Sequence, residues 1–204
     1  MERSGPYHHE NLRETLIEAA VALIGEAGPR AFTLREVARR AGVSHNAPYR
    51  HFAAKDDLLR AVATEGFERL TATMQEWMSR GTTAIERLHL SGSGYVSFAL
   101  RWPNHFLVMF DLPRDQPECS PEAEIGRNAF DVLIKGIMGA QQSGELPTGD
   151  PLPLAFTAWS LVHGVAKLAV SGNLPMTRKG TLEFTRYATR VLTEGLANLR
   201  DEAK

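Results

Sequence analysis

Hydrogen-bonding side chains are concentrated in one short stretch of the chain: His45, Asn46, Tyr49, Arg50 and His51 lie within seven consecutive positions. Imidazole, amide, phenol and guanidinium groups can contact the base edges and phosphate oxygens of a DNA duplex. Residues 28–55 contain six Lys or Arg side chains and one acidic side chain, a net charge of +5, whereas the whole chain carries −1. A positive charge confined to one stretch is typical of a phosphate-binding surface.

Two short helices are predicted to position these side chains. Thr33 and Glu36 have the spacing of a capping box, so a helix is expected to begin there. Gly42 supplies the positive φ that ends this helix, and Ser44 can cap a second helix that extends to about Phe52. The apolar stripe of the first helix consists of Leu34, Val37, Ala38 and Ala41. This pattern predicts a helix-turn-helix; the alternative is an ordinary solvated helix pair.

The motif resembles a known family. Residues 41–59 read AGVSHNAPYRHFAAKDDLL, which is similar to the signature of the TetR/AcrR transcriptional regulators. Further along, Trp159, His163 and Gly164 resemble the Trp-His-Gly type of TetR C-terminal domain. The resemblance implies an all-α protein with a DNA-binding head, a ligand-binding body and a homodimer formed by the last two helices.

The predicted DNA contacts fall into three groups. His45 and Asn46, at the start of the second helix, are expected to reach base edges. Arg35 and Arg50 can contact either bases or phosphates. The expected phosphate contacts are Thr33, Ser44, Tyr49, His51 and Lys55.

The whole chain is predicted to be all-α. It has 204 residues, of which 43% are hydrophobic, and a single cysteine, Cys119, which fits a reducing compartment. No apolar run of about 20 residues and no apolar leader is evident, so a cytoplasmic protein with no membrane contact is expected. With the two short helices, seven further predicted helices make about nine, at 10–27, 55–79, 82–101, 103–111, 122–143, 154–170 and 178–199.

Two domains are expected, a three-helix DNA-binding head at residues 1–54 and a larger helical body at 55–204. The helix at 154–170 is apolar on nearly every side, and the helix at 178–199 carries an apolar stripe. Two such helices from each of two chains form a four-helix interface, which favours a homodimer on a near-palindromic double-stranded DNA operator. The alternative is that both helices complete the core of a monomer.

The body contains large apolar and aromatic side chains with few polar groups, the composition of a pocket for a small hydrophobic or aromatic ligand. The same side chains commonly fill solid cores, so a DNA-binding protein without a ligand response is the main alternative to a ligand-released repressor. The candidate ligand residues are Trp77, Trp102, His105, Phe106, Met109, Phe130, Ile134, Met138, Trp159 and His163.

The sequence does not indicate an enzyme. Phosphate-binding loops, nucleophile elbows and metalloprotease motifs are missing, and neither a cofactor nor a metal is expected. One enzyme hypothesis stays open, a hydrolase built from His105, His163 and a carboxylate. At the N-terminus, Tyr7, His8 and His9 are interpreted as part of a flexible arm, since adjacent histidines lack the spacing of a metal site.

Overall fold

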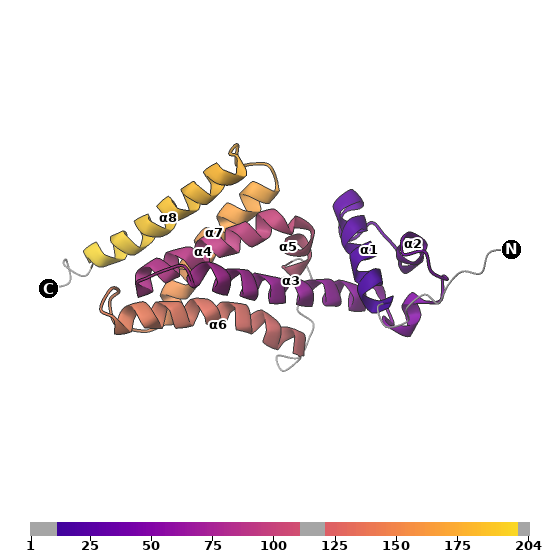
Figure 1. The fold of residues 1–204 in the computed structure, drawn as a ribbon, viewed down its shortest axis with the longest axis horizontal. Helices are drawn as coiled ribbons and strands as arrows, with labels where there is room; N and C mark the ends of the chain where they lie inside the picture. The colour runs from indigo at the N-terminus through magenta and orange to yellow at the C-terminus, as the bar shows by residue number, and fades with distance from the viewer. Residues whose placement is uncertain (1–11, 111–120, 200–204) are drawn as a thin grey trace. The chain divides into compact units, whose positions relative to one another are not determined.

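The computed structural model describes residues 12–110 and 121–199, and these contain helices and no strand (Figure 1). The all-α prediction is therefore confirmed for this part of the chain. The predicted arm around Tyr7, His8 and His9 lies outside the described residues, as does Cys119. The helices are α1 (Leu12–Ala27), α2 (Leu34–Arg40), the 3-10 helix η2 (Pro48–Arg50), α3 (Lys55–Met78), α4 (Ala84–Arg101), α5 (Pro103–Met109), α6 (Pro121–Gln142), α7 (Pro151–Val170) and α8 (Arg178–Leu199).

The chain divides into two compact units. The first contains the described residues up to Glu65 together with those from Asn104 to Phe110, and the second contains Gly66–Pro103 and the described residues from Pro121 onward. Helix α3 runs through the division between residues 65 and 66. The domain boundary expected at residues 54 and 55 stays a prediction.

In the first unit, α1 buries one face against the helix-turn-helix. Leu16, Ala20 and Ile24 are at most 2% exposed, and Val37 and Ala38 on α2 are fully buried. Glycine ends both helices: Gly28 follows α1 at φ 87° and Gly42 follows α2 at φ 69°. These are left-handed conformations, which only glycine adopts routinely.

In the second unit, α4 is the central helix and packs against α6, α7 and α8. Two glycines of α4, Gly92 and Gly94, mark close contacts with neighbouring helices. A Cβ on Gly94 would lie 3.0 Å from the Cα of Met74 on α3, and one on Gly92 would lie 3.1 Å from methyl groups of Val162 and Thr189. Glycine therefore lets α4 approach the backbone of α3 closely, and it makes room for side-chain methyl groups of α7 and α8.

The face of α8 that packs on α4 carries a threonine ladder, which consists of Thr181, Thr185, Thr189 and Thr193. Each hydroxyl donates to the carbonyl four residues earlier, for example Thr185 to Thr181 at 2.8 Å and Thr189 to Thr185 at 3.0 Å. All four side chains are buried. Because the hydroxyls are satisfied within α8, the methyl groups are available for packing.

A distant carboxylate holds the N-terminus of α4. Glu145, in the loop after α6, accepts hydrogen bonds from the amides of Ala84 at 3.1 Å and Ile85 at 3.3 Å. Thr83 caps the same helix by accepting from the amide of Glu86 at 3.1 Å. These bonds satisfy amides that the first turn of a helix leaves without partners. They also hold the pKa of the Glu145 carboxyl below its usual range, with a hydrogen bond from Ser143 as the largest cause.

Helix α7 differs from the sequence-based prediction in one respect. Pro151–Val170 is long and apolar enough to cross a membrane by length and composition, although no such run had been expected. A Cβ on Gly164 would meet nothing within 4 Å in this chain. Within one chain α7 is not buried on all sides, since Leu152, Phe156 and Leu168 are exposed. A helix with this composition and exposure needs a further partner for its outer face.

Candidate nucleic-acid interface and ligand site

The capping box fixes the start of α2. The amide of Glu36 donates to the Thr33 hydroxyl oxygen at 3.3 Å, and the Glu36 carboxylate accepts from the Thr33 amide at 2.7 Å and from its hydroxyl at 2.9 Å. The two hydrogen bonds from Thr33 hold the pKa of Glu36 below its usual range. The predicted box is confirmed. The Thr33 hydroxyl, expected to contact phosphate, donates its proton to Glu36 in this structure.

The turn after α2 is equally well defined by hydrogen bonds. Val43 donates to the carbonyl of Ala38 at 3.0 Å, and Gly42 donates to that of Arg39 at 3.3 Å. This is the paired pattern by which a left-handed glycine closes a helix.

The second helix of the motif differs from the prediction. A helix was expected from Ser44 to about Phe52, but the structure has turns followed by the three-residue 3-10 helix η2, Pro48–Arg50. Pro48 has no amide to donate to Ser44, and a segment this short gains few helical hydrogen bonds. The Ala47 amide donates to Ser44 instead, and Arg50 donates to Ala47, both in the tighter three-residue pattern.

The predicted DNA contacts lie together on the surface of this motif. Ala47 and Pro48 turn inward and are buried, while the neighbouring polar side chains point outward, with Tyr49 52% exposed. Eight of the nine predicted residues are exposed: Thr33, Arg35, Ser44, His45, Asn46, Tyr49, Arg50 and His51. The ninth, Lys55, is half-buried.

Lys55 begins α3, as expected, but its ammonium has partners inside the first unit. Nζ donates to the carbonyl oxygen of Arg30 at 2.9 Å and lies 4.4 Å from the centre of the Phe32 ring. The amide of Ala54, just before α3, donates to the Asp57 carboxylate at 2.9 Å. Lys55 was expected to contact a phosphate, and in this structure its ammonium donates to Arg30 while the neighbouring Ala54 amide donates to Asp57.

Three of the seven ligand candidates in the second unit, on α6 and α7, form a connected group with Tyr95 of α4. The Tyr95 hydroxyl lies 2.8 Å from His163 Nδ1, and the rings of Trp159 and His163 have centroids 5.9 Å apart. Phe130 stacks edge-on against Trp159, also at 5.9 Å. Met138 is 42% exposed, so its side chain does not belong to a closed core. The candidates His105, Phe106 and Met109 lie in the first unit.

Tyr95 was missed as a site residue because its helical position was interpreted as an apolar one. Burial raises the pKa of its hydroxyl far above the usual range, opposed by a hydrogen bond with the Trp159 side chain. The pKa of His163 is lowered by burial and by the positive charge of Lys167. The lowered pKa favours the neutral imidazole of His163, and the tautomer of its ring decides whether Nδ1 accepts from the Tyr95 hydroxyl or donates to it. A tyrosine directly after Gly94 gave no signal in the sequence specific enough to select it as a site residue.

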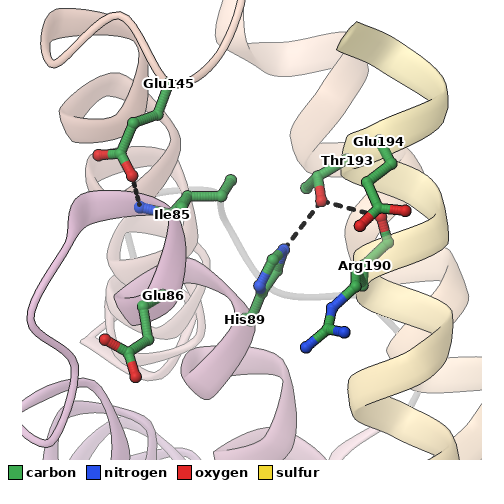
Figure 2. Close-up of a pocket in the computed structure, with 7 residues that line it drawn as sticks. All are labelled: Ile85, Glu86, His89, Glu145, Arg190, Thr193 and Glu194. Atoms are coloured by element: carbon green, nitrogen blue, oxygen red, sulfur yellow. Dashed lines mark hydrogen bonds between the residues drawn. The ribbon is translucent and has the colours of Figure 1, made fainter. Parts of the chain in front are cut away.

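A cavity of about 420 Å³ lies between α4, α8 and the loop after α6, and it contains none of the predicted ligand residues (Figure 2). His89 faces it, and its Nε2 lies 2.8 Å from the Thr193 hydroxyl. Burial lowers the pKa of His89, and Arg190 adds to this effect. Figure 2 shows Arg190 and Glu194 on the α8 side and Glu86 on the α4 side. Two of the cavity's carboxylates, Glu86 and Glu145, already accept bonds from residues 82–85.

No metal was expected from the sequence. In the described ranges, no group of three or more His, Cys, Asp or Glu side chains is placed to bind a metal ion. The two histidines of the open hydrolase hypothesis belong to different compact units, His105 to the first and His163 to the second. His105 Nε2 lies 3.7 Å from the Glu65 carboxylate. That the chain is not an enzyme stays a prediction.

Two family models match the chain. Residues 16–62 match "Bacterial regulatory proteins, tetR family", and residues 88–192 match "Tetracyclin repressor-like, C-terminal domain". A similar curated protein is the HTH-type transcriptional repressor Rv3405c of Mycobacterium tuberculosis, 29% identical over 111 residues. That alignment covers 50% of this chain and 59% of the relative, so the chain spans less than two thirds of its length. The Fatty acid metabolism regulator protein of Bacillus subtilis is 29% identical over 147 residues, 69% of this chain and 73% of the relative.

Solved structures share the fold over most of their length. A protein of unknown function from Rhodococcus sp. RHA1 has a TM-score of 0.82 and 33% identity, and the match covers 95% of this chain and all of that one. The transcriptional regulator FadR from Bacillus subtilis, solved in complex with stearoyl-CoA, has a TM-score of 0.75. At 23% identity, over 89% of this chain and 98% of that one, this likeness shows the fold alone.

Proposed function

The chain belongs to the TetR family of bacterial regulatory proteins, and on that premise we propose that it is a ligand-responsive repressor of transcription. It acts in the cytoplasm as a homodimer on a near-palindromic operator. A small hydrophobic molecule bound in the helical body releases it from the DNA.

One observation carries the DNA-binding part of this proposal, the exposed polar surface of the helix-turn-helix. Asn46, Tyr49 and Arg50 protrude there, while Ala47 and Pro48 between them are buried. In this arrangement His45 and Asn46 read base edges. Thr33, Ser44, Tyr49 and His51 contact the phosphates of the DNA backbone, and Arg35 and Arg50 contact either bases or phosphates.

The dimer part is supported by the exposed apolar side chains of α7 and α8. Phe156 is 53% exposed, Tyr187 66% and Val191 50%. Large exposed apolar groups gathered on two helices are typical of an interface with another subunit. A two-fold dimer places two recognition elements on one duplex, so the operator is a near-palindrome.

The ligand part is supported by the group formed by Tyr95, Phe130, Trp159 and His163. Aromatic faces beside a few oriented polar groups are the usual lining of a small-molecule site. A relative is named a fatty acid metabolism regulator, and the FadR structure contains stearoyl-CoA. Long-chain acyl thioesters are therefore the first ligand class to test.

The switch requires that ligand and operator favour different conformations. Helix α3 is continuous from Lys55 to Met78, so it connects the operator-binding motif with the body. A coupling of about 3 kcal/mol lowers operator affinity by roughly 150-fold, and operator must weaken ligand binding by the same factor.

The deciding experiment has two stages. First, an operator is selected from a random duplex library with wild-type protein. Then stearoyl-CoA affinity is measured by calorimetry with and without saturating operator. Weaker ligand binding with operator supports the switch, and equal affinities contradict it. The absence of any ligand-induced shift in melting temperature across a hydrophobic library favours the alternative, a DNA-binding protein with a solid core.

Paired variants locate the ligand. Trp159→Ala is expected to change ligand affinity and leave ligand-free operator binding nearly intact. Arg190→Ala, which alters the cavity between α4 and α8, is the matched control and is expected to leave ligand affinity unchanged. The reverse result places the ligand in that cavity instead.

A further inference from the structure

A buried tyrosine and a half-buried histidine form the polar part of the aromatic group in the body. The Tyr95 hydroxyl, on α4, lies 2.8 Å from Nδ1 of His163, on α7. Tyr95 is 4% exposed, whereas His163 is only half-buried. The imidazole is therefore the end of this pair that a ligand in the body can reach, and the phenol is the shielded end.

Burial and a neighbouring indole decide which atom donates in this pair. A hydroxyl on a side chain that is 4% exposed needs an acceptor for its proton, and Nδ1 at 2.8 Å provides one. The Trp159 side chain also forms a hydrogen bond with this hydroxyl, which opposes the rise in the pKa of Tyr95 that burial causes. Because an indole N–H group can only donate, the tyrosine oxygen accepts from Trp159 and its own proton is directed at His163.

This direction determines where the imidazole carries its proton. Burial, and then the positive charge of Lys167, lowers the pKa of His163, so the neutral ring is favoured. A neutral imidazole carries one proton, and a ring whose Nδ1 accepts carries it on Nε2. The side chains of Trp159, Tyr95 and His163 then form one hydrogen-bond network, which runs from indole to phenol to imidazole and ends in a donor, the Nε2–H group.

The side chains around this network are aromatic. The rings of Trp159 and His163 have centroids 5.9 Å apart, and Phe130 contacts Trp159 edge-on at 5.9 Å. On its other side, Phe130 lies 5.3 Å from the ring of Phe156. One polar group beside several apolar faces suits a ligand with one polar end on an apolar body. A donor at that place needs an acceptor on the ligand.

We propose that Tyr95 is a positioning residue, which holds His163 as the Nε2–H tautomer, and that the site therefore selects apolar ligands that carry a carbonyl or carboxylate oxygen. This inference rests on the proposed ligand response and adds the chemistry of the ligand's head group. A head group that can only donate, such as an ammonium, is rejected because it meets another donor.

The tautomer is tested first in the free protein, so this test depends on no ligand. Long-range proton–nitrogen correlation spectra distinguish protonated from unprotonated ring nitrogens, and the His163 signals are those missing from His163→Leu. Wild type is expected to show a protonated Nε2 and an unprotonated Nδ1 at neutral pH. In Tyr95→Phe the two nitrogen shifts are expected to move toward each other, because both tautomers become populated. A protonated Nδ1 in wild type, or identical shifts in Tyr95→Phe, overturns the proposal.

Ligand selectivity is tested with two probes of equal chain length. The head group of dodecanoate can only accept hydrogen bonds, and that of dodecylammonium can only donate. Calorimetry is expected to show that wild type binds dodecanoate about ten- to hundredfold more tightly. Tyr95→Phe is expected to reduce this ratio roughly three- to tenfold, because the donor is no longer held in place. Equal affinities of wild type for the two probes, or an unchanged ratio in Tyr95→Phe, overturn the proposal.

Two further variants separate the donor from nearby charge and from packing. Lys167→Met removes an exposed positive charge near His163, so it is expected to lower the ratio while Nε2 stays protonated. In a double-mutant cycle, Tyr95→Phe is expected to leave the ratio unchanged in the His163→Leu background, because the tyrosine acts through the imidazole. An undiminished effect of Tyr95→Phe in that background overturns the positioning role.

The same measurements distinguish failure of this inference from failure of the proposed function. A wild type that binds neither probe refutes the head-group selectivity, and the spectra still decide whether Tyr95 fixes the tautomer. A wild type that prefers dodecanoate but binds it equally well with and without operator refutes the switch and supports the inference.

Discussion

The outer surface of the helix-turn-helix and that of α7 and α8 are opposite in chemistry. The first exposes His45, Asn46 and Arg50 around a buried Ala47 and Pro48. The second exposes Phe156 and other large apolar side chains on helices whose remaining faces pack on α4. A polar, positively charged surface suits a polyanion, whereas an apolar surface suits a protein partner. The contrast indicates two separate binding surfaces with two different kinds of partner.

The largest expected effect comes from placing a charge on the apolar surface. Phe156→Glu buries an unpaired carboxylate in the proposed dimer, so the dissociation constant is expected to rise at least 100-fold, about 3 kcal/mol. Sedimentation at micromolar concentration measures it, with Lys135→Glu on α6 as the control for added negative charge. A wild-type protein that sediments as a monomer would contradict the proposal that the apolar surface of α7 and α8 is a dimer interface.

The polar surface is tested by truncating one base-reading group. Asn46→Ala is expected to cost about 1–3 kcal/mol in operator affinity and to relax the preference at one or two base pairs. Binding-site selection from a random library measures both effects. Asn173→Ala, an exposed asparagine between α7 and α8, is the control and should leave the selected sequence unchanged. An unchanged preference in Asn46→Ala would show that this surface does not read bases there.

Two glycines test how closely the helices of the body pack, because one lies in a close helix contact and the other lies beside open space. Gly94→Ala places a Cβ 3.0 Å from the backbone of α3, so we expect a loss of about 1–3 kcal/mol in unfolding free energy. Gly139→Ala, also in a helix, meets nothing within 4 Å and is expected to stabilise by up to about 1 kcal/mol. Urea unfolding of both variants measures whether each substitution lowers or raises the free energy of unfolding. Equal effects would contradict the close contact of α4.

The smallest effect concerns the charge in the capping box. The pKa of Glu36 is lowered in the folded state, so its contribution to stability is present above the ordinary glutamate pKa of about 4.3 and is lost as the pH falls through the lower folded value. Glu36→Gln keeps a side chain that fits the box. Its melting temperature should fall below that of wild type at pH 7 and match it at pH 3. A difference that persists at pH 3 would be due to geometry and not to charge.

The first unit was largely predictable because its signals are local. A capping box, a glycine and an apolar stripe are each contained within four to eight residues, and the structure confirms the box at Thr33 and the turn at Gly42. The prediction was wrong for the second helix of the motif. Pro48 lacks the amide that an α-helix would need there, and the segment forms a 3-10 helix instead.

The body was predictable as helices but not as a site. An apolar residue on a helix has the same pattern in the sequence whether it faces a core, a cavity or another subunit. Met138 and Phe156 are exposed, while Phe106 is 1% exposed and belongs to the other compact unit. Likewise the sequence cannot show that Lys55 meets Arg30, because that contact depends on the tertiary fold.

The threonine ladder of α8 has a consequence for how α8 packs on α4. Its hydroxyls donate to carbonyls of α8 itself, so the surface that α8 presents to α4 includes threonine methyl groups, with a methyl of Thr189 beside Gly92. The hydrogen bond between His89 and Thr193 joins α4 and α8 directly. The contact of α8 with α4 therefore depends mainly on close packing of methyl groups, and a larger side chain at Gly92 would push the two helices apart.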